Sequence, residues 1–312
     1  MLWIEKYRPK DFEDFVGQEH IAKRIKAFVG QKNIPHLMFS GPAGVGKSTL
    51  ALIIAKKMFG DTWKHNFLEL NASDSRGIDV IRNEVKDFAK TRSLSMSSHK
   101  IIFLDESDAL TKDAQQALRR TMETYSNSVR FIFSCNYSTK IIDPIQSRCA
   151  IFRFKPLSLE ETKKVIKKIE EEENIKLDEK VYGILHELSS GDLRRVENVL
   201  QSCASINNHI TESLVYEIVS AAQPKEVKEV LDLAVKGDFI SSKKKLLTAM
   251  LEHSLTGLDV IKQIQKEIWD LKISDDRKID LITKCAEIEF RMVEGSDEFI
   301  QLEALLANFV KK

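Results

Sequence analysis

Residues Gly41 to Thr49, with the sequence GPAGVGKST, decide the fold of this chain. An apolar run at 37–39 precedes them and an aliphatic helical pattern at 50–54 follows, which predicts a strand, a glycine-rich loop and a helix in turn. Glycines in the loop allow backbone angles that are closed to other residues, so successive amide N–H groups can point at one anion. The stretch therefore predicts a triphosphate-binding loop.

Two side chains at the end of this loop would complete the phosphate site. Lys47 would place its charge on the β and γ phosphates, and Ser48 would offer its hydroxyl to Mg²⁺. The following helix would present its positive N-terminal end. The alternative is a glycine-rich turn that only joins a strand to a helix, and the apolar strand and aliphatic helix on either side disfavour it.

The composition is that of an ordinary globular protein. The chain has 312 residues, of which 43% are hydrophobic and 30% charged, enough for two or three domains. No apolar run reaches the length of a membrane span and the first residues, MLWIEKYRPK, lack the apolar core of a secretion signal. We expect no membrane partner and a location in the cytosol or, in a eukaryote, the nucleus.

Charge and cysteine usage limit the possible partners. The net charge is +1, so any nucleic-acid contact must be a local patch or be concentrated by assembling several copies. The four cysteines are scattered, without a Cys-x-x-Cys pair, which argues against zinc and fits reduced thiols. We expect no metal beyond the Mg²⁺ of the nucleotide.

Short apolar runs alternate with helical stretches from Pro35 to about Pro156. This alternation predicts a mostly parallel sheet that is covered on both faces and binds ligands at the carboxyl ends of its strands. Polar residues follow each of the first four runs, which predicts one functional rim. The runs are 37–39, 67–70, 101–104, 131–134 and 151–154.

Helical patterns replace the strands after Pro156. Ser158 and Glu161 predict a capping box at the start of a helix, and the acidic run 170–173 is interpreted as a solvated helix end. From Glu226 onward only helical patterns remain, and such a unit without polar clusters suits assembly better than chemistry. The predicted parts are an α/β ATPase domain at 1–156, a small helical domain at 157–222 and an all-helical domain at 223–312.

Two adjacent carboxylates end the apolar run at 101–104. Asp105 would hold hydrated Mg²⁺, and Glu106 would orient or deprotonate the attacking water of a Mg-ATPase. Without the phosphate loop, such a strand end would more often simply meet solvent. Asn136, after the next run, would place an amide between the γ phosphate and that water, or would be an ordinary turn residue.

Two arginines are candidates for cations near the phosphates. Arg148 would act on the transferring phosphate within its own subunit or a neighbouring one; otherwise it is a surface arginine or part of a structural ion pair. Arg194 would let the helical domain close over the nucleotide.

An aromatic and apolar cluster upstream of the loop either walls an adenine ring or forms a packed N-terminal arm. Its members are Tyr7, Arg8, Pro9, Val16 and Gly17.

The segment 76–100 has more basic than acidic residues and is the candidate DNA contact. Arg76 precedes a helical pattern, and Arg82 and Lys86 are four positions apart on one predicted helix face. This arrangement suits contacts with DNA phosphates, and the alternative is a solvated helix of mixed charge.

Taken in order, these motifs resemble those of AAA+ ATPases, and more closely those of the small subunits of replication factor C, the clamp loader of archaea and eukaryotes. The resemblance covers nearly the whole chain. It rests on WIEKYRP (3–9), VGQ (16–18), GPAGVGKST (41–49), LNASDSRGI (70–78), FLDESDALT (103–111), AQQALRRTME (114–123), FSCNY (133–137), SRC (147–149), GDLRR (191–195) and FRMVEGSDEFIQLEALLA (290–307).

The resemblance implies one ATP and Mg²⁺ site with Asn136 and Arg194 as its two sensors. It also implies that Arg148 is an arginine finger that reaches the ATP of a neighbouring subunit. Residues 1–156 would be the AAA+ domain, 157–222 its lid and 223–312 a collar. The implied ATP contacts are Tyr7, Arg8, Val16, Gly17, Gly41, Pro42, Ala43, Gly44, Val45, Gly46, Lys47, Ser48, Thr49, Asn136 and Arg194, with Asp105 and Glu106.

In function, the resemblance implies ATP-dependent loading of a PCNA-type sliding clamp onto primer-template DNA, with hydrolysis stimulated by both. The partners would be a large subunit and further small-subunit copies in a five-subunit assembly, in the cytoplasm at the nucleoid of an archaeon or in a eukaryotic nucleus. Ala43 and Ser48 stand where the family often has proline and threonine. Two rivals are another DNA-remodelling AAA+ motor, such as a branch-migration helicase or an initiator, and a scaffold that binds ATP without hydrolysing it.

Overall fold

The computed structural model describes residues 1–73, 78–91, 99–219, 224–252 and 255–310. Contacts within the chain divide it into two compact units, Met1–Ala204 and Ser205–Lys312. The division into three parts with boundaries after residues 156 and 222 stays a prediction. In the described part of the chain, no helix combines the length and the apolar composition that a membrane span needs.

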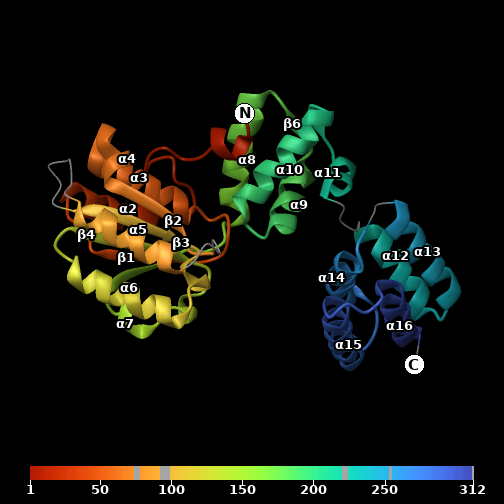
Figure 1. Cartoon of the computed structure of the whole chain (residues 1–312). Helices are drawn as coiled ribbons and strands as arrows, with labels where there is room; N and C mark the ends of the chain where they lie inside the picture. The colour runs from red at the N-terminus through yellow and green to blue at the C-terminus, as the bar shows by residue number, and fades with distance from the viewer. Residues whose placement is uncertain (74–77, 92–98, 220–223, 253–254, 311–312) are drawn as a thin grey trace. The chain divides into compact units, whose positions relative to one another are not determined.

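A five-stranded parallel sheet is the centre of the first unit (Figure 1). Its spatial order is β2-β3-β4-β1-β5, so β4 lies between β3 and β1. The strands are β1 (His36–Ser40), β2 (Phe67–Asn71), β3 (Lys100–Asp105), β4 (Val129–Cys135) and β5 (Cys149–Arg153). This confirms the predicted parallel sheet and gives the strand order, which the sequence pattern does not contain.

Alternate residues of the strands belong to two separate hydrophobic cores. Leu37 and Phe39 of β1 pack with the helices α2 (Glu19–Gly30) and α3 (Lys47–Phe59). Met38, between them, packs with α5 (Ile78–Lys90) and α6 (Lys112–Thr124). Since successive side chains of a strand point to opposite faces, the sheet has helices on both faces, as predicted (Figure 1).

The strand order brings polar residues together at one rim. β1 leads into the glycine-rich loop and α3, β3 ends at Asp105, and β4 is followed by Asn136. Because β4 pairs with both β1 and β3, Asn136 lies between the loop and the carboxylates. The carboxyl ends of the parallel strands thus bring these polar residues to one rim, where the sequence predicted the functional site.

Helices follow the sheet in the first unit. They are α8 (Leu159–Glu173), α9 (Glu179–Ser189) and α10 (Leu193–Ile206). Ser158 and Glu161 form the predicted capping box at the start of α8. The prediction that strands stop after Pro156 is wrong, since β6 (Lys176–Leu177) and β7 (His209–Ile210) are short strands. Two residues are too few to show the alternation that reveals a strand in sequence.

The described part of the second unit after β7 consists of helices and their connections, and the helices between Pro224 and Val310 share one hydrophobic core. Ile261, Ile264 and Leu305 are among its fully or almost fully buried members. Its helices are α11 (Glu212–Val219), α12 (Pro224–Val235), α13 (Phe239–Glu252), α14 (Gly257–Glu267), α15 (Asp275–Val293) and α16 (Glu298–Val310), with the 3₁₀ turn η4 (Ile268–Asp270). Short elements of the first unit are α1 (Trp3–Lys6), η1 (Gly60–Thr62), α4 (Trp63–Asn66), η2 (Ser107–Ala109), η3 (Ser138–Lys140) and α7 (Asp143–Gln146).

Candidate nucleotide-binding site

The loop between β1 and α3 needs its glycines for both conformation and space. Gly44 and Gly46 have φ angles of +69° and +94°, which other residues rarely adopt. A Cβ atom on Gly44 would lie 1.6 Å from Oδ1 of Asp192, and one on Gly46 would lie 2.6 Å from Cζ of Phe15. The loop is therefore packed tightly against the N-terminal segment and the start of α10.

The Lys47 ammonium lies in the curve of this loop. Its Nζ donates to the carbonyl oxygens of Gly41 at 2.5 Å and Pro42 at 2.6 Å, and to Oδ1 of Asn136 at 3.1 Å. The residue is buried, and burial lowers the pKa of the ammonium while the charge of Asp105 raises it. Lys47 thus joins the loop to the end of β4, where it can meet the anionic oxygens of a phosphate.

Two oxygen groups meet on the other side of the loop. The hydroxyl of Ser48 donates to Oδ2 of Asp105 at 2.6 Å, and the backbone N–H of Glu106 donates to Oδ1 of the same carboxylate at 3.0 Å. Hydroxyl and carboxylate oxygens are the donors that Mg²⁺ takes at nucleotide sites. Glu106 has a φ of +50°, which is uncommon for a residue with a side chain and often marks functional sites.

Two adjoining cavities share Gly44, Val45, Gly46 and Arg194 in their walls. The smaller, of about 80 Å³, is lined by the loop and by Asp105, Glu106, Ser134 and Asn136. The larger, of about 460 Å³, is lined by the N-terminal segment, the loop and the helices α8 and α10. A small polar cavity next to a larger one, whose walls combine apolar side chains such as Val16 and Ile169 with charged ones, fits a nucleotide.

Most of the predicted ATP contacts line these cavities. The larger is lined by Tyr7, Arg8, Val16, Gly44, Val45, Gly46, Thr49 and Arg194, and the smaller by Ala43, Gly44, Val45, Gly46, Lys47, Ser48, Asp105, Glu106, Asn136 and Arg194. Gly17, Gly41 and Pro42 line neither of the two, although the carbonyl groups of Gly41 and Pro42 hold Lys47. The roles of all these residues as ATP contacts stay predictions.

Hydrogen bonds tie the N-terminal segment to the helices that wall the larger cavity. Glu173, at the end of α8, accepts from the Tyr7 hydroxyl and the Lys6 ammonium, each at 2.7 Å. The backbone N–H of Trp3 donates to Oε1 of Gln201 in α10 at 2.9 Å. The interpretation of the acidic run as a solvated helix end is therefore wrong for Glu173, because its partners come from the distant N-terminal segment. It is also wrong for Glu170, which accepts from the backbone N–H of Leu177 at 3.1 Å and from the hydroxyl of Tyr182.

Sequence reasoning missed several residues of the larger cavity. Lys164, Val165, Lys168 and Ile169 of α8 and Glu197 of α10 also line it. Glu197 is only 6% exposed, and burial raises the pKa of its carboxyl to about 7. Its position one helical turn after Arg194 was the available signal, since residues three apart on a helix share a face.

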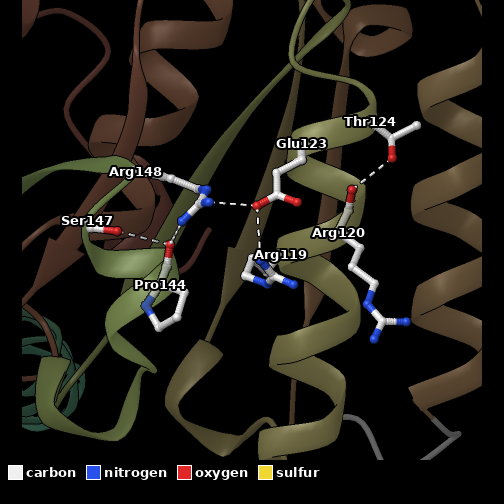
Figure 2. A network of polar contacts seen from close by, with 7 residues as sticks. All are labelled: Arg119, Arg120, Glu123, Thr124, Pro144, Ser147 and Arg148. Atoms are coloured by element: carbon white, nitrogen blue, oxygen red, sulfur yellow. Dashed lines mark hydrogen bonds and ion pairs between the residues drawn. The ribbon is translucent and has the colours of Figure 1, made fainter.

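Arg148 lines neither of these cavities. Figure 2 shows its guanidinium between Glu123 of α6 and the carbonyl group of Pro144 in α7. Nη2 donates to Oε1 of Glu123 and Nη1 to the Pro144 oxygen, both at 2.6 Å. The side chain is 37% exposed. The structural ion pair considered from sequence is present, and it leaves part of the guanidinium accessible.

The candidate DNA contacts are only partly described. Arg76 lies outside the described residues. Arg82 and Lys86 both belong to α5, where Lys86 is exposed and the side chain of Arg82 is outside the described part. Contact with DNA stays a prediction for all three.

The loop, the acidic end of β3 and the parallel sheet define a P-loop ATPase of the AAA class. In agreement, residues 37–157 match the model of the ATPase family associated with various cellular activities, and residues 222–308 match that of the replication factor C C-terminal domain. Replication factor C small subunits are 50% identical to this chain in Methanococcus vannielii and 48% in Archaeoglobus fulgidus. Those matches cover 98% of this chain and 97% and 96% of the relatives.

The chain therefore belongs to the replication factor C small subunit family, whose members are clamp-loader ATPases. The Holliday junction branch migration motor RuvB of Thermotoga maritima has a similar structure, with a TM-score of 0.57 over 73% of this chain and 79% of RuvB. At 18% identity this likeness concerns the fold alone. The rival interpretation as a branch-migration motor is not favoured, because the relatives of high identity are replication factor C subunits.

Proposed function

We propose that this chain uses ATP and Mg²⁺ to load a PCNA-type sliding clamp onto primer-template DNA. The observation that carries the proposal is the pair of hydrogen bonds from Lys47 to Asn136 and from Ser48 to Asp105. These hydrogen bonds hold the side chains that would bind phosphate, metal and water at one rim of the sheet, beside a cavity large enough for a nucleoside. This arrangement supports hydrolysis rather than a scaffold role.

Each residue of this rim has a distinct part in hydrolysis. Lys47 binds the β and γ phosphates, and Asn136 orients the attacking water. Ser48 and Asp105 would hold Mg²⁺, which would neutralise negative charge on the phosphates. Glu106 takes a proton from the water as its oxygen bonds to the γ phosphorus and the bond to the β-phosphate oxygen breaks. ADP and inorganic phosphate are the products.

We propose further that Arg148 acts on the ATP of a neighbouring subunit. Its exposed position outside the two cavities of its own subunit supports this role. A guanidinium stabilises charge on the transferring phosphoryl group. Arg194, in the wall of both cavities, would respond to the phosphates of its own subunit and draw the lid over them.

The partners are a large subunit and further copies of the small subunit in a five-subunit complex. Large apolar side chains exposed on the second unit support a role of this unit in assembly. Ile240 is 80% exposed, Ile300 67% and Phe290 66%. Arg76, Arg82 and Lys86 would follow the phosphates of the primer-template duplex. In an archaeal cell such a complex works in the cytoplasm at the nucleoid.

Steady-state ATP hydrolysis tests this function. The chain is assayed alone and with its partner subunits, with and without sliding clamp and primed DNA, alongside Glu106→Gln and Arg148→Ala. We expect stimulation by clamp and primed DNA that both substitutions abolish while nucleotide still binds. A rate indifferent to the clamp would contradict clamp loading, and wild-type nucleotide binding without hydrolysis would favour a scaffold.

A further inference from the structure

Glu123 is the side-chain partner of Arg148 in this structure. Its Oε1 accepts from Nη2 at 2.6 Å, while the carbonyl group of Pro144 accepts from Nη1 at the same distance (Figure 2). A guanidinium has more N–H donors than these two acceptors use. Arg148 is thus held in one orientation with further donors available to an outside anion.

Glu123 is itself held in place on α6. Arg119, one helical turn earlier, donates from Nη1 to the same Oε1 atom at 3.1 Å (Figure 2). Its side chain is 30% exposed, less than that of Glu123 at 43%. Two guanidiniums against one carboxylate leave the cluster with a net positive charge, so the cluster still attracts phosphate.

Helix α6 links this cluster to the nucleotide rim of its own subunit. The helix starts at Lys112, soon after Glu106, and the hydroxyl of Thr111 caps it by accepting from the backbone N–H of Ala114 at 3.3 Å. Gln115 fastens the helix to the segment before Arg148, since it accepts from the N–H of Ile142 at 2.8 Å. Glu123 therefore projects from the last turn of a helix that is anchored at its first turn.

We infer that Glu123 is a positioning residue that orients Arg148 toward the ATP of the neighbouring subunit. The inference rests on the proposed role of Arg148. A free arginine side chain samples many rotamers, and these must be lost when it meets a phosphate. The Glu123 carboxylate already holds Arg148 in one orientation, so most of this entropy cost is removed before the neighbouring subunit binds. A charged carboxylate also forms a stronger hydrogen bond with the guanidinium than a neutral acceptor does.

The test is a double-mutant comparison in the assembled complex with clamp and primed DNA. Kcat and KM for ATP are measured for Glu123→Ala, Glu123→Asp, Arg148→Ala and the double variant Glu123→Ala/Arg148→Ala. We expect Glu123→Ala to lower kcat about tenfold and to leave KM unchanged, because Arg148 regains its rotamer freedom when its partner is removed. Glu123→Asp keeps the charge and should recover part of the loss. In the Arg148→Ala background, removal of Glu123 should have no further effect.

Matched controls separate positioning from folding. Asp113→Asn changes another exposed acid of α6 and should leave kcat unchanged, and thermal unfolding of each variant checks that it folds. A full additional loss from Glu123→Ala in the Arg148→Ala background would overturn the inference while leaving Arg148 as the finger. An Arg148→Ala complex with unchanged kcat would instead refute the proposed role of Arg148 and, with it, this inference.

Discussion

Replacing Glu197 by glutamine should make the chain more stable at pH 8 and change its stability little at pH 4. Glu197 is only 6% exposed in α10, and burial raises the pKa of its carboxyl to about 7. The negative charge of Asp192 raises this pKa further, and Arg194 lowers it. Lys164 and Lys168 of α8 line the same cavity.

The sign and size of the effect follow from this pKa. The unfolded chain releases the proton near pH 4.5 and the folded chain only near pH 7, so the folded state binds more protons between these values. The contribution of Glu197 to stability is therefore greatest below pH 4.5 and is lost as the pH rises through 7. The loss is at most about 3 kcal/mol. Glutamine stays neutral throughout and avoids it.

Urea unfolding of the full chain between pH 4 and pH 8 measures this difference. The stability gained by Glu197→Gln should grow with pH and level off above pH 7. The matched control is Glu171→Gln, at an exposed acid of α8, which should show no such trend. A stability difference between Glu197→Gln and the wild type that stays constant with pH would show that the Glu197 carboxyl does not titrate differently in the folded and unfolded chains.

Three further substitutions test the site and its closure. Ser48→Ala removes the hydroxyl beside the β3 carboxylate, so ATP hydrolysis should require more Mg²⁺, which a Mg²⁺ titration measures. Gly44→Ala places a Cβ atom 1.6 Å from Asp192 at a φ of +69°, so binding of a fluorescent ATP analogue should weaken at least about tenfold. Tyr7→Phe removes the 2.7 Å hydrogen bond to Glu173 and should lower the unfolding free energy by about 1 kcal/mol.

Each of these three has an outcome that contradicts it. An unchanged Mg²⁺ requirement would show that the Ser48 hydroxyl is not a metal ligand. Normal nucleotide affinity in Gly44→Ala would show that the close approach of Asp192 is not needed for binding. Equal stability of Tyr7→Phe and the wild type would mean that the N-terminal segment is held by its other contacts.

The parts of the site that depend on local sequence were predictable. The glycines at 44 and 46, Lys47 and Ser48 are consecutive or nearly so, and their chemistry follows from their order. Asp105 and Glu106 follow a run of buried apolar residues, which places them at a strand end. The order of residues along the sequence was sufficient in these cases, because a single loop or a single strand end positions all the side chains concerned.

The parts that depend on distant partners were not predictable. Glu173 accepts a hydrogen bond from Tyr7, 166 positions away in the sequence. The amphipathic pattern of a helix predicts which of its faces is buried, but it does not predict which distant segment packs against that face. Glu123 and Arg148 were each visible as charges, but their pairing requires the packing of α6 against α7. The acidic run shows the same limit, since Glu171 is exposed whereas Glu173 is half-buried.

Retention of the sliding clamp on DNA is the most direct test of clamp loading. The complex that contains this chain is mixed with labelled clamp and primed circular DNA, with or without ATP, and clamp that stays on the DNA is separated by gel filtration. We expect ATP-dependent retention that Lys47→Ala in this chain abolishes. Equal retention without ATP, or full retention with Lys47→Ala, would contradict it.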